Sequence, residues 1–248
     1  MKFFARNRYN QIKEAGEGLY ERNHMGLTVR SSHLNTLRNT FDNIFLKGIY
    51  DFEANTERPY IIDGGANIGL ATLYWKSKYP YSKIVAFEPS REVHKMLIAN
   101  LEENEIEGVD VYQKALYDKE TVLNFTSNEA LSGSLVLEKD LDEVYQVETT
   151  LLSRFITKEV ALLKLDIEGA ELEVLKEIQP KLDRVERIFL EYHAFESKPQ
   201  QLSILLGTLE DAGFRYHLTS EYALDSPFLG FRKSLGQDLQ VNIWAIRC

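Results

Sequence analysis

The apolar positions of the chain follow two different periods from Tyr60 onward. Short, nearly continuous apolar runs alternate with segments in which apolar residues recur every three or four positions. These patterns are typical of buried strands and of amphipathic helices, respectively. Strands that alternate with helices indicate an α/β fold, with a largely parallel sheet and helices on both faces. The predicted strands are residues 60–63, 83–87, 109–116, 160–165 and 188–192, and the predicted helices are 70–80, 90–101 and 202–213.

Further strands are predicted outside this regular alternation. Residues 216–222 and 241–246 predict a C-terminal antiparallel hairpin that closes the sheet. Residues 121–126 and 146–151 are short β-like runs on either side of a polar loop that contains Ser132-Gly133-Ser134. We expect this loop to contribute to a substrate pocket.

The first 55 residues do not fit the alternating pattern, so we divide the chain into an N-terminal extension, 1–55, and a main domain, 56–248. Apolar residues recur at helical spacing at Leu34, Leu37, Phe41, Ile44 and Phe45. This spacing predicts an amphipathic helix over 32–46. The helix either packs on the edge of the sheet or forms a lid or a wall of the acceptor pocket, and the sequence leaves both alternatives open.

A glycine-rich loop follows the first strand of the main domain, in the run Asp63-Gly64-Gly65-Ala66-Asn67-Ile68-Gly69. Gly65 and Gly69 let the backbone turn and approach a ligand without a Cβ in the way, and Asn67 tolerates a positive φ. Glu88 ends the second strand, 19 residues beyond Gly69. A carboxylate at that point is placed to accept both hydroxyls of a ribose. The loop and Glu88 together predict an adenosine-containing cofactor.

The spacing of the loop favours S-adenosylmethionine over a nicotinamide dinucleotide. The dinucleotide fingerprint G-x-G-x-x-G leaves a pyrophosphate on a helix N-terminus, whereas the special residues of this loop follow in steps of two. Asp63 would repel a pyrophosphate, but it could order the loop or receive the methionine ammonium group through water. A nicotinamide-dependent oxidoreductase is the alternative enzyme, and a non-catalytic cofactor-binding protein of the same fold is the alternative without activity.

Three motifs carry a family resemblance: the loop at 63–69, Ala86-Phe87-Glu88-Pro89, and Lys164-Leu165-Asp166-Ile167-Glu168-Gly169-Ala170-Glu171. They resemble the FkbM-type S-adenosylmethionine-dependent methyltransferases over roughly Ile49 to Gly213. The resemblance implies a Rossmann-like class I methyltransferase fold with a mostly parallel seven-stranded sheet. It also implies O-methylation of polyketides, glycans or related metabolites, and hence a small-molecule or sugar acceptor. One departure is Thr150-Leu151-Leu152-Ser153, where the family has Thr-Leu-Asp, so the role of that acid is not carried over.

The candidate site residues lie at the carboxyl ends of the predicted strands, where ligands bind in open α/β sheets. The expected cofactor-binding residues are Asp63, Gly64, Gly65, Ala66, Asn67, Gly69, Glu88, Pro89, Ala115 and Asp166. The expected catalytic residues are Asp166, Glu168 and His193.

Each catalytic candidate has a distinct expected role. Asp166 and Glu168 form an acidic pocket beside the sulfonium, although acids are also favoured at a helix start by the macrodipole. Two carboxylates could in addition bind a divalent cation, but the sequence identifies no third ligand. His193 ends the fifth predicted strand and is a candidate general base because histidine titrates near neutral pH.

Composition narrows the range of partners. The net charge is −9, and no basic patch suited to nucleic acid is present. The one cysteine, Cys248, allows no disulfide within the chain and no thiolate metal cluster. The first eight residues become polar too soon for a signal peptide, and no apolar stretch reaches the roughly 18 residues of a membrane span. We therefore expect a cytoplasmic enzyme.

Overall fold

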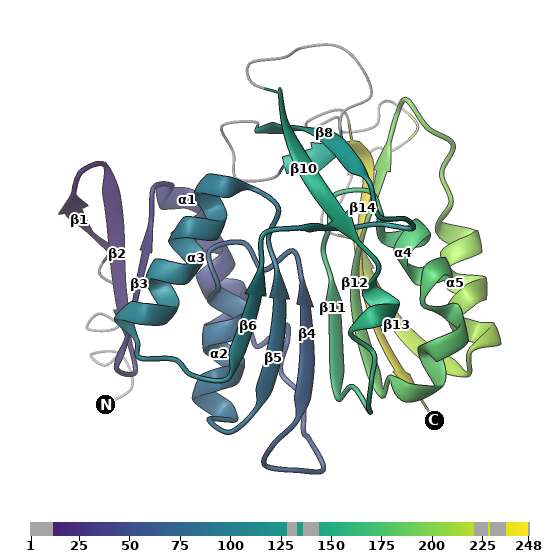
Figure 1. Ribbon diagram of the computed structural model, residues 1–248, viewed down its shortest axis with the longest axis horizontal. Coiled ribbons are helices and arrows are strands. Elements are labelled where there is room, and N and C mark those ends of the chain that lie inside the picture. The colour runs from purple at the N-terminus through teal and green to yellow at the C-terminus, as the bar shows by residue number, and fades with distance from the viewer. Residues whose placement is uncertain (1–11, 128–132, 136–143, 221–227, 229–236, 248) are drawn as a thin grey trace.

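A seven-stranded sheet forms the centre of the molecule, in the order β13-β14-β12-β11-β4-β5-β6 (Figure 1). The computed structural model describes residues 12–127, 133–135, 144–220, 228 and 237–247. Ser132, the end of the predicted strand 216–222, and Cys248 lie outside these residues. The strands are β4 Tyr60–Gly64, β5 Lys83–Phe87, β6 Val109–Tyr112, β11 Leu162–Leu165, β12 Arg187–Phe195, β13 Phe214–Ser220 and β14 Gln237–Arg247. The pairs from β6 to β12 are parallel, and β14 is antiparallel to both β12 and β13, which confirms the predicted fold.

The central strands are buried on both faces because helices cover the sheet from either side. Every residue of β4 and β11 is buried. Successive side chains of a strand point to opposite faces, so Ile61 packs in one apolar cluster and Ile62 in the other. Strands that are buried on both faces require continuous apolar runs. The central strands could therefore be predicted from the sequence.

The helices lie in two layers. On one side of the sheet are α1 Leu34–Phe41, the π-helical turn η1 Asp42–Leu46, α2 Leu70–Lys78 and α3 Arg91–Glu103, and on the other are α4 Glu171–Glu177 and α5 Leu202–Asp211. Short 3₁₀ turns are η2 Leu152–Arg154 and η3 Gln179–Arg184. The three predicted helices of the main domain are confirmed as α2, α3 and α5. None of the helices in the described ranges has the length and apolarity needed to cross a bilayer.

A second, smaller sheet stands above the carboxyl ends of the parallel strands (Figure 1). Its order is β7-β10-β8-β9, and its strands are β7 Ala115–Leu116, β8 Val122–Ser127, β9 Gly133–Leu135 and β10 Val144–Thr150. The predicted strand 109–116 is therefore two strands: β6 belongs to the central sheet, and β7 pairs with β10 in the small one. This change of sheet brings β7 and β8 over the strand ends.

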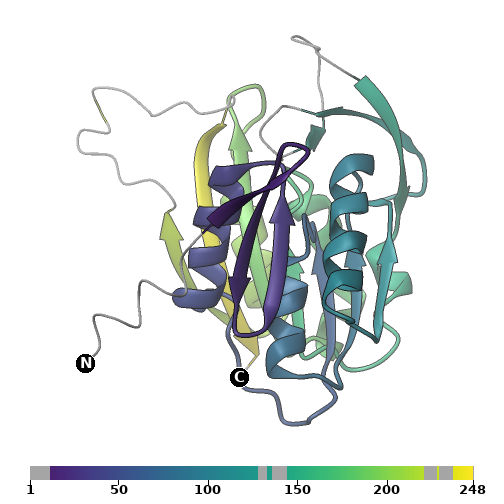
Figure 2. The same cartoon turned by 90° about the vertical axis from the view of Figure 1, so that its left-hand side faces the viewer.

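The extension contains a three-stranded antiparallel sheet that the sequence pattern did not predict. Its strands are β1 Ile12–Gly16, β2 Leu19–His24 and β3 Leu27–Ser31, and it lies beside α3 (Figure 2). Two asparagines, Asn100 of α3 and Asn104 directly after it, serve as partners for the edge of β3. Asn100 Oδ1 accepts the Arg30 N–H at 2.9 Å, Asn104 Oδ1 accepts the Thr28 N–H at 2.7 Å, and both amide groups donate back to the carbonyls of the same residues.

The predicted helix of the extension is confirmed as α1 with η1, and the segment after it is fastened to the main domain. Trp244 Nε1 donates to the Ile49 carbonyl at 2.7 Å, and Trp75 Nε1 donates to the Tyr50 carbonyl at 3.1 Å. The Tyr50 ring meets Phe189 edge-on, with centroids 4.7 Å apart. This segment therefore joins β12, β14 and α2.

Candidate active site

The loop after β4 is held between the ends of two neighbouring strands. Gly65, Asn67 and Gly69 have φ values of 75°, 51° and 90°, as the sequence predicted for this turn. The Gly65 and Ala66 N–H groups both donate to the Phe87 carbonyl at the end of β5, at 3.0 and 2.8 Å. A Cβ on Gly65 would lie 1.8 Å from the Asp166 carbonyl oxygen. Only a glycine allows this approach between the loop and the end of β11.

Asp63 and Lys164 form a buried pair beneath the loop. Asp63 has no exposed surface, and its Oδ2 accepts the Thr72 hydroxyl at 2.8 Å. Lys164 Nζ lies 3.5 Å from Asp63 Oδ1 and donates to the Gly65 carbonyl at 2.7 Å. Burial raises the pKa of Asp63, and the Lys164 charge opposes that rise. Burial disfavours the charged lysine, but Asp166 and Asp63 outweigh it and raise the pKa of Lys164.

This arrangement bears on the two roles expected for Asp63. Its carboxylate contacts α2 and Lys164 rather than the pocket, so the geometry fits an acid that orders the loop. Lys164 was not among the predicted site residues. The available signal was a single lysine in an otherwise apolar strand. The structure places it directly opposite Asp63 in the register of β11 and β4.

Glu88 lies at the end of β5 with both carboxylate oxygens fixed. Oε2 accepts the Asn67 N–H at 3.0 Å and Oε1 accepts the Ser90 N–H at 2.8 Å. Burial raises the pKa of Glu88 to about 7, against the opposing effect of these two N–H groups. A carboxylate oxygen can accept more than one hydrogen bond. Each oxygen therefore retains acceptor capacity for a ligand hydroxyl.

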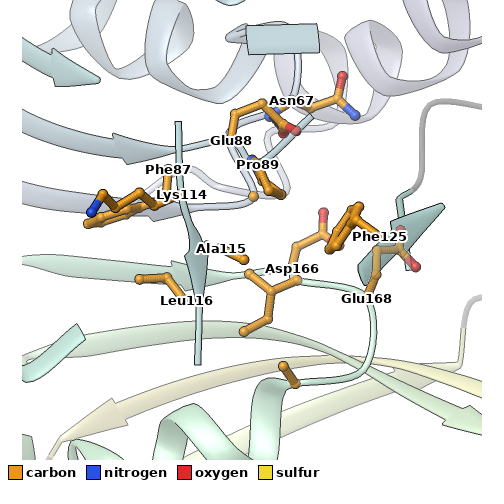
Figure 3. Close-up of a pocket in the computed structure, with 13 residues that line it drawn as sticks. Asn67, Phe87, Glu88, Pro89, Lys114, Ala115, Leu116, Phe125, Asp166 and Glu168 are labelled. Atoms are coloured by element: carbon orange, nitrogen blue, oxygen red, sulfur yellow. Dashed lines mark hydrogen bonds between the residues drawn. The ribbon is translucent and has the colours of Figure 1, made fainter. Parts of the chain in front are cut away.

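A pocket lies above the loop, between the central sheet and the small sheet (Figure 3). It is lined by Gly65, Asn67, Phe87, Glu88, Pro89, Lys114, Ala115, Leu116, Phe125, Asp166, Ile167, Glu168 and Ala170. Seven of these were predicted from the sequence: Gly65, Asn67, Glu88, Pro89, Ala115, Asp166 and Glu168. The predicted residues Asp63, Gly64, Ala66 and Gly69 are buried in or under the loop and do not line it.

Six lining residues were not predicted, and three of them, Phe87, Ile167 and Ala170, lie within or beside motifs that the sequence already singled out. The other three share a cause. Phe125 comes from β8, and Lys114 and Leu116 flank Ala115 at β7. No local pattern shows that these strands leave the central sheet and cover the pocket.

Acidic residues gather at the other end of the pocket, around His193. Its Nδ1 lies 3.0 Å from Glu171 Oε1, and its Nε2 lies 3.6 Å from Glu168 Oε2 and 3.9 Å from Glu191 Oε1. The prediction that His193 ends its strand is wrong, because pairing with β14 continues β12 to Phe195. The imidazole is 1% exposed and lies behind Glu168, outside the pocket lining.

The charges around His193 bear on its expected role as a general base. Burial lowers its pKa, but Glu171, Glu168 and Asp166 outweigh burial and raise it to about 10. Burial also raises the pKa of Glu168 to about 7 and that of Glu191 to about 8. An imidazole that is protonated at neutral pH has no free lone pair for another proton. These observations favour His193 as a partner of the surrounding carboxylates over His193 as the base.

The fold and this pocket agree with a comparison to known families. A model of the methyltransferase FkbM domain matches residues 63–216, a range that includes every residue lining the pocket. The chain belongs to the FkbM methyltransferase family. It is therefore an S-adenosylmethionine-dependent methyltransferase, and the nicotinamide-dependent alternative is not supported.

Two curated proteins and one solved structure are also similar to this chain. The chain is 33% identical to Methyltransferase 1 of Beauveria bassiana over 158 residues, which cover 54% of this chain and 64% of that protein. It is 31% identical to Methyltransferase sdnD of Sordaria araneosa over 211 residues, 70% of this chain and 80% of that one. The crystal structure of Methyltransferase FkbM from Methylobacillus flagellatus has a TM-score of 0.52 at 12% identity, covering 82% of this chain and 47% of that chain. That structure shares the fold.

The residues of this FkbM pocket fit the family's cofactor. Glu88 offers acceptor capacity to ribose hydroxyls, and Gly65 and Asn67 of the loop line the pocket beside it. Asp166 and Glu168 present carboxylates to the same pocket, which suits a cationic sulfonium.

Proposed function

We propose that this FkbM methyltransferase transfers a methyl group to a hydroxyl oxygen of a small molecule or a sugar. The observation that carries the proposal is the presence of Asp166 and Glu168 in the same pocket as Glu88 (Figure 3). A hydroxyl must lose its proton as it accepts a methyl group, and a carboxylate within reach can take that proton. The proposed acceptor side is therefore the end of the pocket at Asp166 and Glu168.

Each group of pocket residues has a distinct task in this proposal. When bound, S-adenosylmethionine supplies an electrophilic methyl group on its sulfonium. Glu88 and Asn67 hold the ribose end, and Asp63 and Lys164 keep the loop in place beneath it. Phe125 and Ile167 line the pocket with apolar surface, which excludes water and strengthens electrostatic interactions inside. Orientation of the acceptor supplies much of the rate enhancement in such a displacement.

We propose that the extension, residues 1–55, is a packing element and that the main domain is 56–248. Two features support this over a lid. The described residues of the extension contribute nothing to the pocket lining. Its sheet is bound to Asn100 of α3 and to Asn104, the residue that follows the helix.

The proposal is tested by binding and product analysis. Calorimetric titration should give micromolar-range affinity for S-adenosylmethionine and for S-adenosylhomocysteine, and no detectable binding of NAD. Incubation with hydroxylated sugars and small metabolites, using a cofactor with a deuterated methyl group, should give a labelled product in which the methyl carbon is bonded to oxygen.

A matched pair of variants identifies the acceptor side. Asp166→Asn combined with Glu168→Gln should lower turnover, whereas Glu102→Gln, at an exposed position of α3, should not. A product methylated on nitrogen or carbon would contradict the hydroxyl acceptor. Tighter binding of NAD than of S-adenosylmethionine would contradict the assignment of S-adenosylmethionine as the cofactor.

A further inference from the structure

We propose that Asp166, Glu191 and His193 form a binding site for a divalent cation of the Mn²⁺ type, beside the proposed acceptor side. The three side chains each offer one ligand atom, and these atoms lie within 4.8 Å of one another. Metal–ligand bonds of about 2.0–2.2 Å allow two ligand atoms at most about 4.4 Å apart. A contraction of a few tenths of an ångström therefore closes the site around an ion.

The topology of the sheet brings these residues together. Leu165 and Leu190 pair in the parallel register of β11 and β12, so the residues that follow them, Asp166 and Glu191, are neighbours. His193 lies two residues beyond Glu191, on the same face of β12. The site is therefore built on the end of β11 and on the interior of β12, which pairing with β14 continues to Phe195.

His193 supplies an observation that is independent of the acids. Its side chain is 1% exposed, and Nδ1 is held by Glu171 Oε1 at 3.0 Å. Nε2 points toward Glu168 and Glu191 at 3.6 and 3.9 Å, and within the described residues it has no partner at hydrogen-bond distance. Histidine ligands of metals have this arrangement, with one ring nitrogen held by a carboxylate and the other facing the ion. The ion replaces the proton that Nε2 otherwise carries.

The other two ligands are also oriented by neighbours. Lys164 Nζ lies 3.5 Å from Asp166 Oδ2, and Gln240 Nε2 donates to Glu191 Oε1. The ligands are surrounded by two further carboxylates, Glu168 and Glu171. Burying several carboxylates together is costly unless positive charge offsets them. Lys164 supplies one positive charge beside Asp166, and a divalent cation supplies more.

The donor set indicates the kind of ion. Carboxylate oxygens suit Mg²⁺, Ca²⁺ and Mn²⁺, while an imidazole nitrogen favours transition metals over Mg²⁺ and Ca²⁺. Mn²⁺ accepts both. Three protein ligands leave coordination positions open, and an ion there can bind the acceptor hydroxyl and lower its pKa. This use of the ion depends on the proposed function, whereas its binding does not.

Electron paramagnetic resonance with Mn²⁺ tests the site in the full chain, with S-adenosylhomocysteine present. Bound Mn²⁺ loses the sharp signal of the aqueous ion, and spin-echo modulation should show coupling to one imidazole nitrogen. His193→Gln should abolish the nitrogen coupling and weaken binding at least tenfold, while His217→Gln, an exposed histidine of β13, should change neither. Glu171→Gln removes the charge that orients His193 and should weaken Mn²⁺ binding about 10- to 100-fold, while Glu173→Gln on the same helix should not.

Several outcomes would overturn the site. The first is absence of Mn²⁺ binding by the wild-type protein, and the second is nitrogen coupling that persists in His193→Gln. The last is displacement of Mn²⁺ by cationic S-adenosylmethionine but not by S-adenosylhomocysteine. The last would mean that the cluster neutralises the sulfonium instead. Glu191→Gln, which keeps a partner for Gln240, gives a second test if His193→Gln does not fold. Cofactor affinity is measured in the same samples, so loss of Mn²⁺ binding alone leaves the methyltransferase proposal intact.

Discussion

At the scale of single residues, Glu88 shows how burial changes the protonation of a side chain that is proposed to bind a ligand. Burial raises its pKa to about 7, so the carboxylate is largely ionised above that pH and protonated below it. Ribose hydroxyls donate to the ionised form. We therefore predict that affinity for S-adenosylhomocysteine falls about 25-fold when the pH is lowered from 7.5 to 5.5, as measured by calorimetry. Glu88→Gln should bind more weakly at pH 7.5 and show little pH dependence, and a flat wild-type profile would contradict the ribose role.

Gly65 is a position at which the structure leaves no room for a side chain. Gly65→Ala combines a positive φ with a Cβ placed 1.8 Å from the Asp166 carbonyl oxygen. We predict a loss of about 2–5 kcal/mol in the free energy of unfolding, from backbone strain plus overpacking, measured by urea denaturation. Gly26→Ala is the matched control: its φ is 87°, but nothing lies within 4 Å of an added Cβ, so about 1–2 kcal/mol is expected. Equal losses in the two variants would show that the contact with Asp166 is unimportant.

Residue identity predicted much of the pocket, but not how deeply each side chain is buried. Glu88, Asn67 and Asp166 were found because loop chemistry and strand ends are local features. Asp63 was expected near the ligand as well, yet it is fully buried against Thr72 and Lys164. Burial of a residue depends on which elements pack over it, and Asp63 is covered by α2 and by the loop that follows it.

At the scale of elements, the strands and helices of the central sheet were predictable and the sheet of the extension was not. The central strands are apolar on both faces because helices cover the sheet from both sides. β1 has four exposed residues out of five, so it lacks any continuous apolar run. The extension sheet is instead fastened by two side-chain amides, one in α3 and one directly after it, about 70 residues further along the chain. No local pattern contains that information.

The contact between β3 and α3 can be tested by removing one amide. Asn100 is 2% exposed, accepts the Arg30 N–H and donates to the Arg30 and Ile68 carbonyls. We predict that Asn100→Ala costs about 2–4 kcal/mol, because these backbone groups lose their partner. Hydrogen exchange should accelerate at the Arg30 amide and remain slow at Ile62 in β4. Asn124→Ala, on the exposed face of β8, is the control, and unchanged exchange at Arg30 would contradict the role of Asn100.

At the scale of the whole molecule, the cofactor is expected to bind the folded chain and not the unfolded one, because its pocket combines β4, β5, β7, β8 and β11. At a concentration 100 times Kd, such a ligand stabilises a protein by about 2.7 kcal/mol. We therefore predict that S-adenosylhomocysteine raises Tm by about 5–11 °C, as followed by calorimetry. NAD should give no shift, and Glu88→Ala should lose most of the shift at the same cofactor concentration. A large shift with NAD would contradict the cofactor assignment.

The hydrogen bond from Trp244 to the Ile49 carbonyl has a consequence for biosynthesis. The two residues are 195 positions apart, a separation that a ribosome translating about 5–20 residues per second covers in about 10–40 s. During that interval the segment at Ile49 has emerged, but β14, which carries its partner, has not yet been made. Tyr50 can already dock on Trp75 of α2, but the Ile49 carbonyl has no Trp244 partner during that interval. Stalled chains that end before Trp244 should therefore be cleaved near Ile49 by a protease that spares the finished protein.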